Sequence, residues 1–219
     1  MSARDEVLAR VRRAHVAAPP PDLAYDGIER AYRTASDLDE EALVERLVDR
    51  LLDYKALVRR CGAEEVAATV ATALRDRGVR SVVVPADLEP HWLTALGEVT
   101  LLLDDGQLTV VDLDAVDGVL TGCAVAVAET GTLVLDGSAG QGRRVVSLIP
   151  DYHLCVLRVD QVVADVPQLV AAVDLTRPVT LISGPSATSD IELNRVEGVH
   201  GPRTLEVVLV GAEPERLGP

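Results

Sequence analysis

ALVRRCGAEEVAATVATALRDRGVRSVVVP, residues 56–85, carries the clearest indication of the fold class. Residues 56–60 predict a strand, and residues 63–78 predict a helix that ends at Gly78. The run RSVVVP is apolar and β-branched, so it predicts a buried strand that Pro85 stops. A strand, a helix and a second buried strand in this order indicate a parallel sheet covered by helices.

The segments that follow continue this alternation. PHWLTAL predicts a short helix and VTLLLDD another strand, and the runs HLCVLRV, PVTLIS and TLEVVLV predict further strands. Within VLTGCAVAVAETGTLVLDG two strands meet at Glu129–Thr132 without a helix between them, which indicates a hairpin. We therefore expect an α/β fold whose sheet is mixed but mostly parallel and is flanked by helices.

An N-terminal helical arm precedes this fold in the sequence. Residues 2–17 predict an amphipathic helix that Ser2 can cap, and APPPD then stops it and begins an extended tether. A second helix is expected from Ser36 or Asp37 to about Leu52. The predicted domains are thus a helix and tether over 1–35, an α/β domain over 36–213 and a tail over 214–219. The arm can pack on its own body or on a neighbour.

Composition excludes several classes of function. The net charge of −14 repels nucleic acid and anionic lipid, so neither partner is expected. The N-terminus lacks an apolar signal core and no long apolar run is present, which indicates a cytoplasmic protein. Cys61, Cys123 and Cys155 lie far apart with no C-x-x-C pair, and His15, His91 and His153 show no ligand-like spacing, so we expect no metal and no cofactor in this chain.

The run GSAGQGRR, residues 137–144, is similar to a phosphate-binding P-loop but lacks its essential side chains. Arg143 and Arg144 stand where the lysine and the hydroxyl of a P-loop belong, so nucleotide hydrolysis is not expected. Two interpretations stay open: a solvated connection, or a loop in which Arg143 binds a carboxylate or phosphate through paired hydrogen bonds.

Glu129 is the acidic residue with the clearest chemical interest. It follows the apolar run CAVAVA and directly precedes Thr130 and Gly131, at the end of a predicted strand. Carboxylates at such strand ends commonly face the ligand crevice, where desolvation would suit a nucleophile or an acid–base group. The alternative is a structural residue that accepts hydrogen bonds from a turn.

The segment 184–203 is rich in turn residues and polar groups. GPSAT resembles a nucleophile elbow, but Thr188 stands in place of the final glycine and Pro185 fits the turn poorly, so a hydrolytic Ser186 is disfavoured. SDIE, residues 189–192, matches a capping box and predicts a short helix that continues through Val196. The turn HGPR, residues 200–203, offers an imidazole and a guanidinium, although a single histidine in a turn is more often structural.

We accordingly predict one site where the hairpin and two turns meet. Its tentative catalytic residue is Glu129, and its expected ligand-binding residues are Thr130, Gly131, Thr132, Arg143, Gly184, Pro185, Ser186, Thr188, Asp190, His200, Gly201 and Arg203.

Three stretches together resemble the LUD-domain family, and within it the single-domain lactate utilization protein C group. They are TGCAVAVAETGTLVL, IPDYHLCVL and ISGPSATSDIELNRVEGVHGPRTLEVVLV, which begin at residues 121, 149 and 182. The resemblance runs from the second predicted helix to about Val210. It departs from the pattern at Ala187, where a basic residue is expected, and this puts anion binding by that loop in doubt.

The resemblance implies a fold like that of the ribose-phosphate isomerase, glucosamine-phosphate deaminase and CoA-transferase (NagB/RpiA/CoA-transferase-like) superfamily. It also implies a part in the oxidation of L-lactate to pyruvate, as a subunit that binds iron–sulfur partner proteins and a small carboxylate or phosphate. The iron–sulfur clusters would then lie in those partners. The alternatives are a stand-alone CoA-transferase-like or sugar-phosphate enzyme that uses Glu129, or a ligand-sensing or scaffold module.

Overall fold

The computed structural model describes residues 2–17, 27–32, 35–188, 196–197 and 201–211. The chain forms two units, Met1–Arg33 and Thr34–Pro219. The first contains helix α1 (Ala3–Ala17), in which no residue is buried and whose first turn is capped by Ser2, as predicted; the Asp5 N–H donates to Ser2 Oγ over 3.2 Å. In the described part of the chain, no helix is long and apolar enough to cross a membrane.

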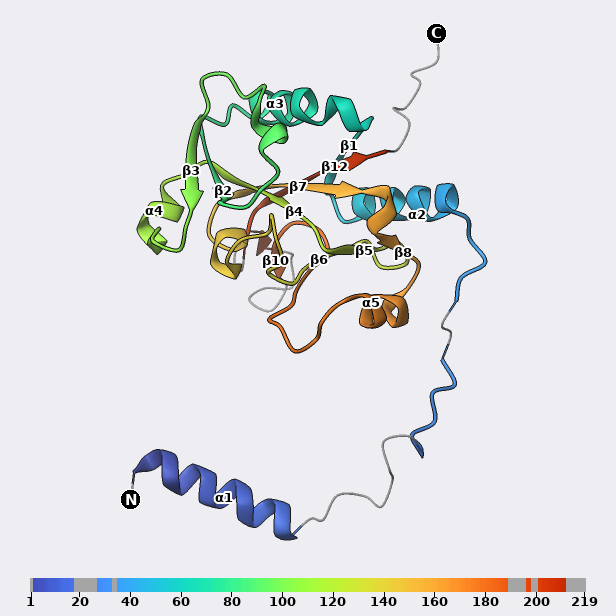
Figure 1. Ribbon diagram of the computed structural model, residues 1–219, viewed down its shortest axis with the longest axis vertical. Coiled ribbons are helices and arrows are strands. Elements are labelled where there is room, and N and C mark those ends of the chain that lie inside the picture. Colours follow the sequence, from blue (N-terminus) through green and yellow to red (C-terminus); the bar gives the residue numbers. More distant parts are fainter. Residues whose placement is uncertain (1, 18–26, 33–34, 189–195, 198–200, 212–219) are drawn as a thin grey trace. The chain divides into compact units, whose positions relative to one another are not determined.

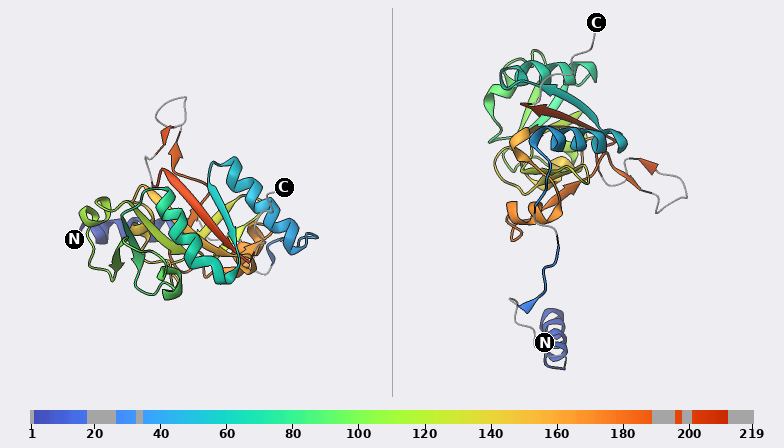
Figure 2. Two further views of the ribbon diagram at one scale, coloured as in Figure 1. Left: turned by 90° about the horizontal axis from the view of Figure 1, so that it is seen from above. Right: turned by 90° about the vertical axis from the view of Figure 1, so that its right-hand side faces the viewer.

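A six-stranded sheet forms the centre of the second unit (Figure 1). All its neighbouring strands are parallel, so the expected α/β fold with a largely parallel sheet is confirmed. In spatial order the strands are β1 (Leu57–Cys61), β12 (Thr204–Val210), β7 (Tyr152–Arg158), β4 (Gly118–Gly122), β2 (Ser81–Pro85) and β3 (Thr100–Asp104). The last strand, β12, therefore lies between the first strand and the rest of the sheet, beside β1 in the left view of Figure 2.

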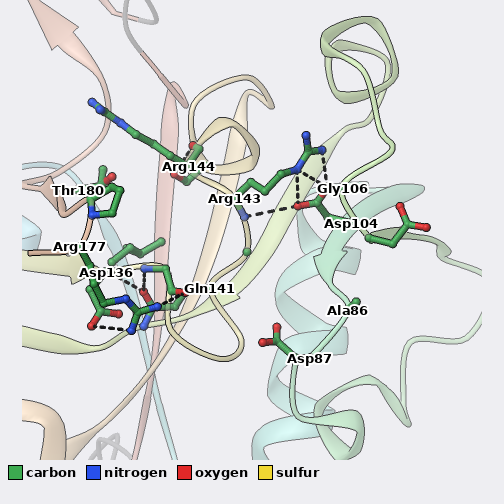
Figure 3. A pocket seen from close by; sticks show the side chains of 16 residues that line it. Ala86, Asp87, Asp104, Gly106, Asp136, Gln141, Arg143, Arg144, Arg177 and Thr180 are labelled. Carbon is green, nitrogen blue, oxygen red and sulfur yellow. Dashed lines mark hydrogen bonds and ion pairs between the residues drawn. The ribbon is translucent and has the colours of Figure 1, made fainter. Parts of the chain in front are cut away.

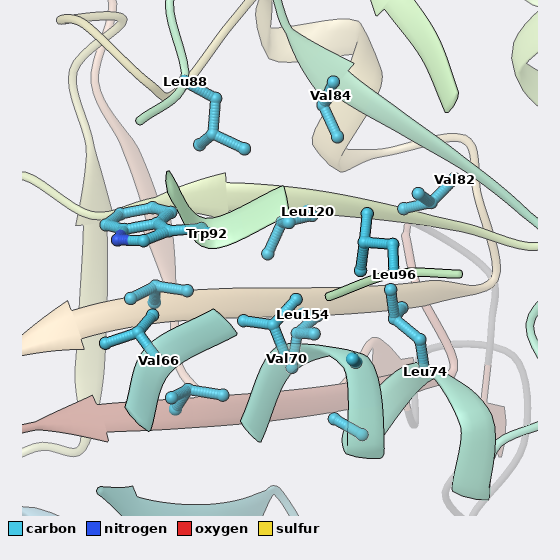
Figure 4. Close-up of a cluster of buried hydrophobic side chains, with 14 of the residues drawn as sticks. Val66, Val70, Leu74, Val82, Val84, Leu88, Trp92, Leu96, Leu120 and Leu154 are labelled. Carbon is cyan, nitrogen blue, oxygen red and sulfur yellow. The ribbon is translucent and has the colours of Figure 1, made fainter. Parts of the chain in front are cut away.

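Helix α3 (Val66–Asp76) covers one face of this sheet. Its side chains Val66, Val70 and Leu74 point toward Leu120 and Leu154 of the sheet (Figure 4). Each of these five side chains is buried, and they form part of the largest apolar cluster. Burial of a complete leucine or valine side chain contributes about 1.5–3 kcal/mol, so this contact is a main source of stability.

The other face is covered by helix α2 (Glu40–Asp53) and by a second sheet. Leu47 and Leu51 of α2 are fully buried against Leu157 and Leu209 of the main sheet. The second sheet has the order β8 (Val162–Val163), β5 (Val125–Val127), β6 (Thr132–Leu135) and β9 (Thr180–Ile182). Strands β5 and β6 pair antiparallel, which confirms the predicted hairpin.

The structure corrects several predicted elements. Helix α2 begins at Glu40 rather than near Ser36 or Asp37, because Asp39 provides its cap by accepting the Ala42 N–H over 2.9 Å. The short helix predicted after Pro90 is a 3₁₀ helix, Pro90–Leu93. Helices α4 (Val110–Asp114) and α5 (Val166–Ala172) and strand β8 were not predicted.

The helix predicted for residues 189–198 is also corrected where the structure describes it. Val196 lies in strand β11 (Val196–Glu197), which pairs antiparallel with β10 (Ala187–Thr188). A two-stranded ribbon therefore stands where the capping-box pattern predicted helical continuation. Residues 189–195 themselves lie outside the described residues.

A charged residue is buried in the middle of β12. The Glu206 side chain is 1% exposed, forms an ion pair with Arg59 of β1 and accepts the Tyr152 hydroxyl of β7 over 2.9 Å. Burial, and then the charge of Glu206, raise the pKa of Tyr152 above its usual range, so the hydroxyl keeps the proton that it donates. These contacts join the three strands β1, β12 and β7 through side chains as well as through the backbone.

We predict that Glu206→Leu destabilises the protein by about 2–4 kcal/mol, because it leaves Arg59 and the Tyr152 hydroxyl without their buried partner. The double variant Arg59→Met/Glu206→Leu should recover part of this loss, since the charge of Arg59 that Glu206 had paired is then removed, although the Tyr152 hydroxyl still lacks its partner. Urea unfolding of the three proteins measures both effects. A Glu206→Leu protein as stable as the wild type would contradict the assignment.

His153 is a second polar group buried in the sheet. Its ring is 1% exposed, and its Nε2 forms a hydrogen bond of 2.7 Å with the Thr121 hydroxyl of β4. Burial lowers the pKa of His153 from 6.5 to about 4, so the ring is neutral near pH 7. The unfolded chain takes up this proton below pH 6.5, whereas the folded protein does so only near pH 4.

The protein should therefore lose stability as the pH falls from 6.5 to 4, by roughly 3 kcal/mol from this residue. His153→Asn keeps a polar partner for Thr121 but does not titrate, so its stability should depend less steeply on pH in this range. His91→Asn, at an exposed position, is the matched control and should keep the wild-type slope. Equal slopes for His153→Asn and wild type in urea unfolding would refute the prediction.

Candidate functional site

Two of the predicted turns lie together beside a small pocket, which we call the turn pocket. Its cavity is about 240 Å³. The two turns line it with residues 180–186 and with Gly201 and Pro202. The main fold contributes Ser147, Leu148, His153 and Leu205. Of the predicted ligand-binding residues, Gly184, Pro185, Ser186 and Gly201 line it. No described aspartate, glutamate, lysine or arginine does so.

Hydrogen bonds between the hairpin and the two turns hold the turn pocket together. The Thr132 hydroxyl is 2.7 Å from the Thr130 hydroxyl and 2.8 Å from the Ser183 hydroxyl, so the β5–β6 hairpin contacts the end of β9. The Ser186 N–H donates to the Pro202 carbonyl over 2.8 Å, which joins the turn after β9 to the turn before β12. The structure thus brings together segments that are about 70 residues apart in sequence.

The glycines of these motifs have a packing role. Gly131 and Gly184 have φ of 61° and 82°, in the left-handed region that favours glycine. A Cβ on Gly131 would lie 2.7 Å from Cβ of Arg50, and a Cβ on Gly184 would lie 2.7 Å from Cβ of Tyr54. Both glycines therefore let the hairpin and the turn approach the C-terminal end of α2 closely, and they shape the site without supplying a functional group.

Glu129 has a different environment from the one the sequence suggested. Its side chain is exposed, and its backbone N–H donates to the Ala164 carbonyl of the neighbouring strand connection over 3.0 Å. It lines neither the turn pocket nor the larger crevice described below. The acid–base hypothesis expected a buried carboxylate here, and the residue is exposed instead.

The other predicted residues are spread over the molecule. Arg203 forms an exposed ion pair with Asp151 over 3.3 Å and does not line the turn pocket. Thr188 belongs to β10 by its backbone, and its side chain lies outside the description. Asp190 and His200 lie outside the described residues.

Arg143 binds a carboxylate, but one that belongs to the protein itself. Its Nε donates to Asp104 Oδ1 over 2.9 Å, and its Nη2 donates to the same oxygen and to the Leu108 carbonyl. Burial would raise the pKa of Asp104, but the hydrogen bonds and charge of Arg143 outweigh it, so the pKa of Asp104 is lowered and the carboxylate stays ionised. The paired geometry expected for this arginine is present, with Asp104 in the place of a ligand.

A larger crevice opens at the carboxyl ends of the parallel strands, and we call it the switch-point crevice. After β2 the chain moves outward to the edge strand β3, and then returns to β4 on the other side of β2. The connections after β2 and β4 lead in opposite directions. Open α/β sheets bind ligands at such a point, outside the carboxyl ends of the two strands. The cavity there is about 730 Å³ and includes Asp87, Asp104, Arg143 and Arg144 (Figure 3).

The GSAGQG loop forms one wall of this crevice and is held rigidly. The buried Gln141 side chain accepts the N–H groups of Asp136 and Gly137 over 2.7 and 3.2 Å. Gly140 donates its N–H to Asp87 and accepts the Gly122 N–H, so the loop is fixed to the ends of β2 and β4. The next helix is only a 3₁₀ turn, Arg144–Ser147, so this loop lacks the α-helix that follows a P-loop.

Sequence reasoning missed three residues of these sites: His153, Asp104 and Gln141. Each is a polar residue beside apolar residues or glycines, and this contrast in the sequence could have identified it. His153 interrupts the strand run DYHLCVL, and Asp104 ends the run LLLD. Gln141 is the only amide in the glycine loop, and its burial follows from the backbone N–H groups that it must satisfy.

The described residues offer no clear metal-binding group of side chains. Across the described residues no three or more histidine, cysteine, aspartate or glutamate side chains are grouped so that they could hold a metal ion. Cys61, Cys123 and Cys155 are buried free thiols, and Cys123 donates to the carbonyls of Val125 and Val134.

Comparison with known proteins places the chain in a family. The LUD domain model matches residues 44–210. A Lactate utilization protein C of Deinococcus radiodurans is 45% identical over 213 residues, 95% of this chain and 96% of that protein. A Lactate utilization protein C of Bacillus subtilis is 30% identical over 118 residues, 49% of this chain and 48% of that protein.

A solved structure agrees with this match. The crystal structure of a DUF162 family protein from Deinococcus radiodurans superposes with a TM-score of 0.68 at 43% identity, and it covers 80% of this chain and 99% of that chain. The sequence likeness over nearly the whole chain and the shared fold lead to one conclusion: this protein belongs to the LUD domain family.

Proposed function

We propose that this protein takes part in the utilization of L-lactate in the cytoplasm, as a ligand-binding subunit that works with iron–sulfur proteins in the oxidation of lactate to pyruvate. The observation that carries the proposal is the 45% identity, over 95% of the chain, to a protein named Lactate utilization protein C. In this scheme the iron–sulfur clusters of the partners accept the two electrons that leave the hydroxy acid, and this chain contributes binding.

The turn pocket is the proposed position of the small acid. Its volume of about 240 Å³ suits a three-carbon hydroxy or keto acid, which leaves space for water. Hydroxyls of Thr180 and Ser183 line it and can donate to a carboxylate, whereas Ser147 donates to the Arg144 carbonyl. No described acidic side chain in the lining repels a carboxylate. The neutral His153 at its base adds a polar contact without a charge.

The alternative of a stand-alone enzyme that uses Glu129 receives no support from the geometry. A carboxylate nucleophile is commonly activated by desolvation in a cleft. Glu129 is exposed and lines neither of the two cavities described above. The proposal therefore gives this residue no catalytic part.

A strain that lacks the gene should grow poorly on L-lactate as its carbon source and normally on pyruvate, because only the oxidation step is lost. A plasmid copy of the wild-type gene should restore growth. Affinity purification of the full chain from lactate-grown cells should recover proteins that contain iron–sulfur clusters, which absorption spectra identify. Normal growth of the deletion strain on lactate would overturn the proposal.

Binding of the acid can be tested on the purified protein. L-Lactate or pyruvate should bind the wild type in calorimetry, and Ser183→Ala should weaken binding about fivefold to tenfold, because one hydrogen bond is lost. Ser36→Ala, outside the pocket, is the matched control and should bind as the wild type does. Equal affinities of Ser183→Ala and wild type would place the acid elsewhere.

A further inference from the structure

The switch-point crevice has a charge pattern that the turn pocket lacks. Three arginines and four aspartates line it, namely Arg143, Arg144, Arg177, Asp87, Asp104, Asp105 and Asp136. Two pairs are already formed within the wall. Arg143 is held by Asp104, and Arg177 lies 3.9 Å from Asp136 and donates to the Gly137 carbonyl over 2.7 Å (Figure 3).

One arginine and two aspartates of the lining remain outside these two pairs. Arg144 is exposed, and its guanidinium has no ion pair or hydrogen bond with any described residue. Asp87 accepts the Gly140 N–H through Oδ1, and Asp105 accepts the Gln107 N–H through Oδ1, so the second carboxylate oxygen of each is open. In Figure 3, Arg144 and Asp87 lie on opposite sides of the crevice.

This distribution selects the chemistry of a ligand. A plain anion would meet Arg144 favourably but would be repelled by Asp87 and Asp105, because like charges at short range are destabilising. An uncharged polyol would leave the arginine unused. A molecule with an oxyanion at one end and several hydroxyl donors at the other satisfies both sides at once, since carboxylates accept hydroxyl protons and a guanidinium binds an oxyanion in paired hydrogen bonds.

We propose that the switch-point crevice is a binding site for an anionic polyol, with Arg144 on the carboxylate or phosphate of the ligand and Asp87 on its hydroxyls. The cavity of about 730 Å³ has room for such a molecule and is about three times as large as the turn pocket. Ala86, Leu135 and Pro178 supply an apolar surface against which its carbon chain can lie. The site is independent of the lactate proposal, because its assigned contacts, Arg144 and Asp87, lie outside the lining of the turn pocket.

Calorimetry with the full-length protein tests this site with five probes. Gluconate and glucose 6-phosphate carry both chemical groups, glucose lacks the anion, and acetate and inorganic phosphate lack the hydroxyl chain. We expect gluconate or glucose 6-phosphate to bind at least tenfold more tightly than the other three. Which of the two binds better tells whether the natural ligand is a carboxylate or a phosphate.

Three variants assign the contacts. Arg144→Gln should weaken binding of the better probe about 10- to 100-fold, as expected for loss of a charge-assisted hydrogen bond. Asp87→Asn should weaken it about fivefold, because the amide accepts hydroxyls less strongly. Arg75→Gln, on the exposed surface of α3, is the matched control and should stay within about twofold of wild type. Circular dichroism melting checks that each variant is folded.

The outcomes separate clearly. Binding that needs both chemical groups and is lost in folded Arg144→Gln supports the proposal. Acetate or phosphate that binds as tightly as the anionic polyols would overturn it in favour of an unspecific anion site. No binding by either anionic polyol, or unchanged binding in Arg144→Gln, would also overturn it, whereas the growth test on lactate would be unaffected.

Discussion

The insertion of β12 between β1 and β7 holds the main sheet together. Strand β1 touches the main sheet through β12 alone, so the first strand of the sheet joins it only when the last strand is in place. Glu206 reinforces this position by contacting Arg59 on one side and Tyr152 on the other. The turn pocket lies at the start of the same strand, so its formation is coupled to completion of the sheet.

Helix α2 has a similar influence on the site, through packing. Its C-terminal end meets Gly131 of the hairpin and Gly184 of the turn after β9, at distances that exclude any side chain. The two glycines thus position Thr132 and Ser183 so that their hydroxyls lie 2.8 Å apart. In the sequence these glycines suggested a ligand-binding loop. In the structure they allow the backbone of the hairpin and of the turn to approach α2 closely.

Two cavities with different chemistry adjoin one another in the second unit. The turn pocket and the switch-point crevice share Ser147 and Thr180 in their linings. One is small and has no described charged group, and the other is large and carries arginines and aspartates, most of them paired. This electrostatic difference is the reason for proposing a small acid in the first cavity and a larger anionic polyol in the second.

Most of the elements and the class of fold follow from local sequence patterns, because alternation of apolar strands and amphipathic helices depends on neighbouring residues. Helices α4 and α5 and strand β8 were not predicted, and Val196 lies in a strand where a helix was expected. The β5–β6 hairpin was also predicted from these patterns. Only the tertiary structure decided the roles of side chains: Arg143 is occupied by Asp104, Glu129 is exposed, and His153 is buried as a neutral ring. The reason is that charge pairing and desolvation depend on residues distant in the chain, such as positions 104 and 143, which a local pattern does not relate.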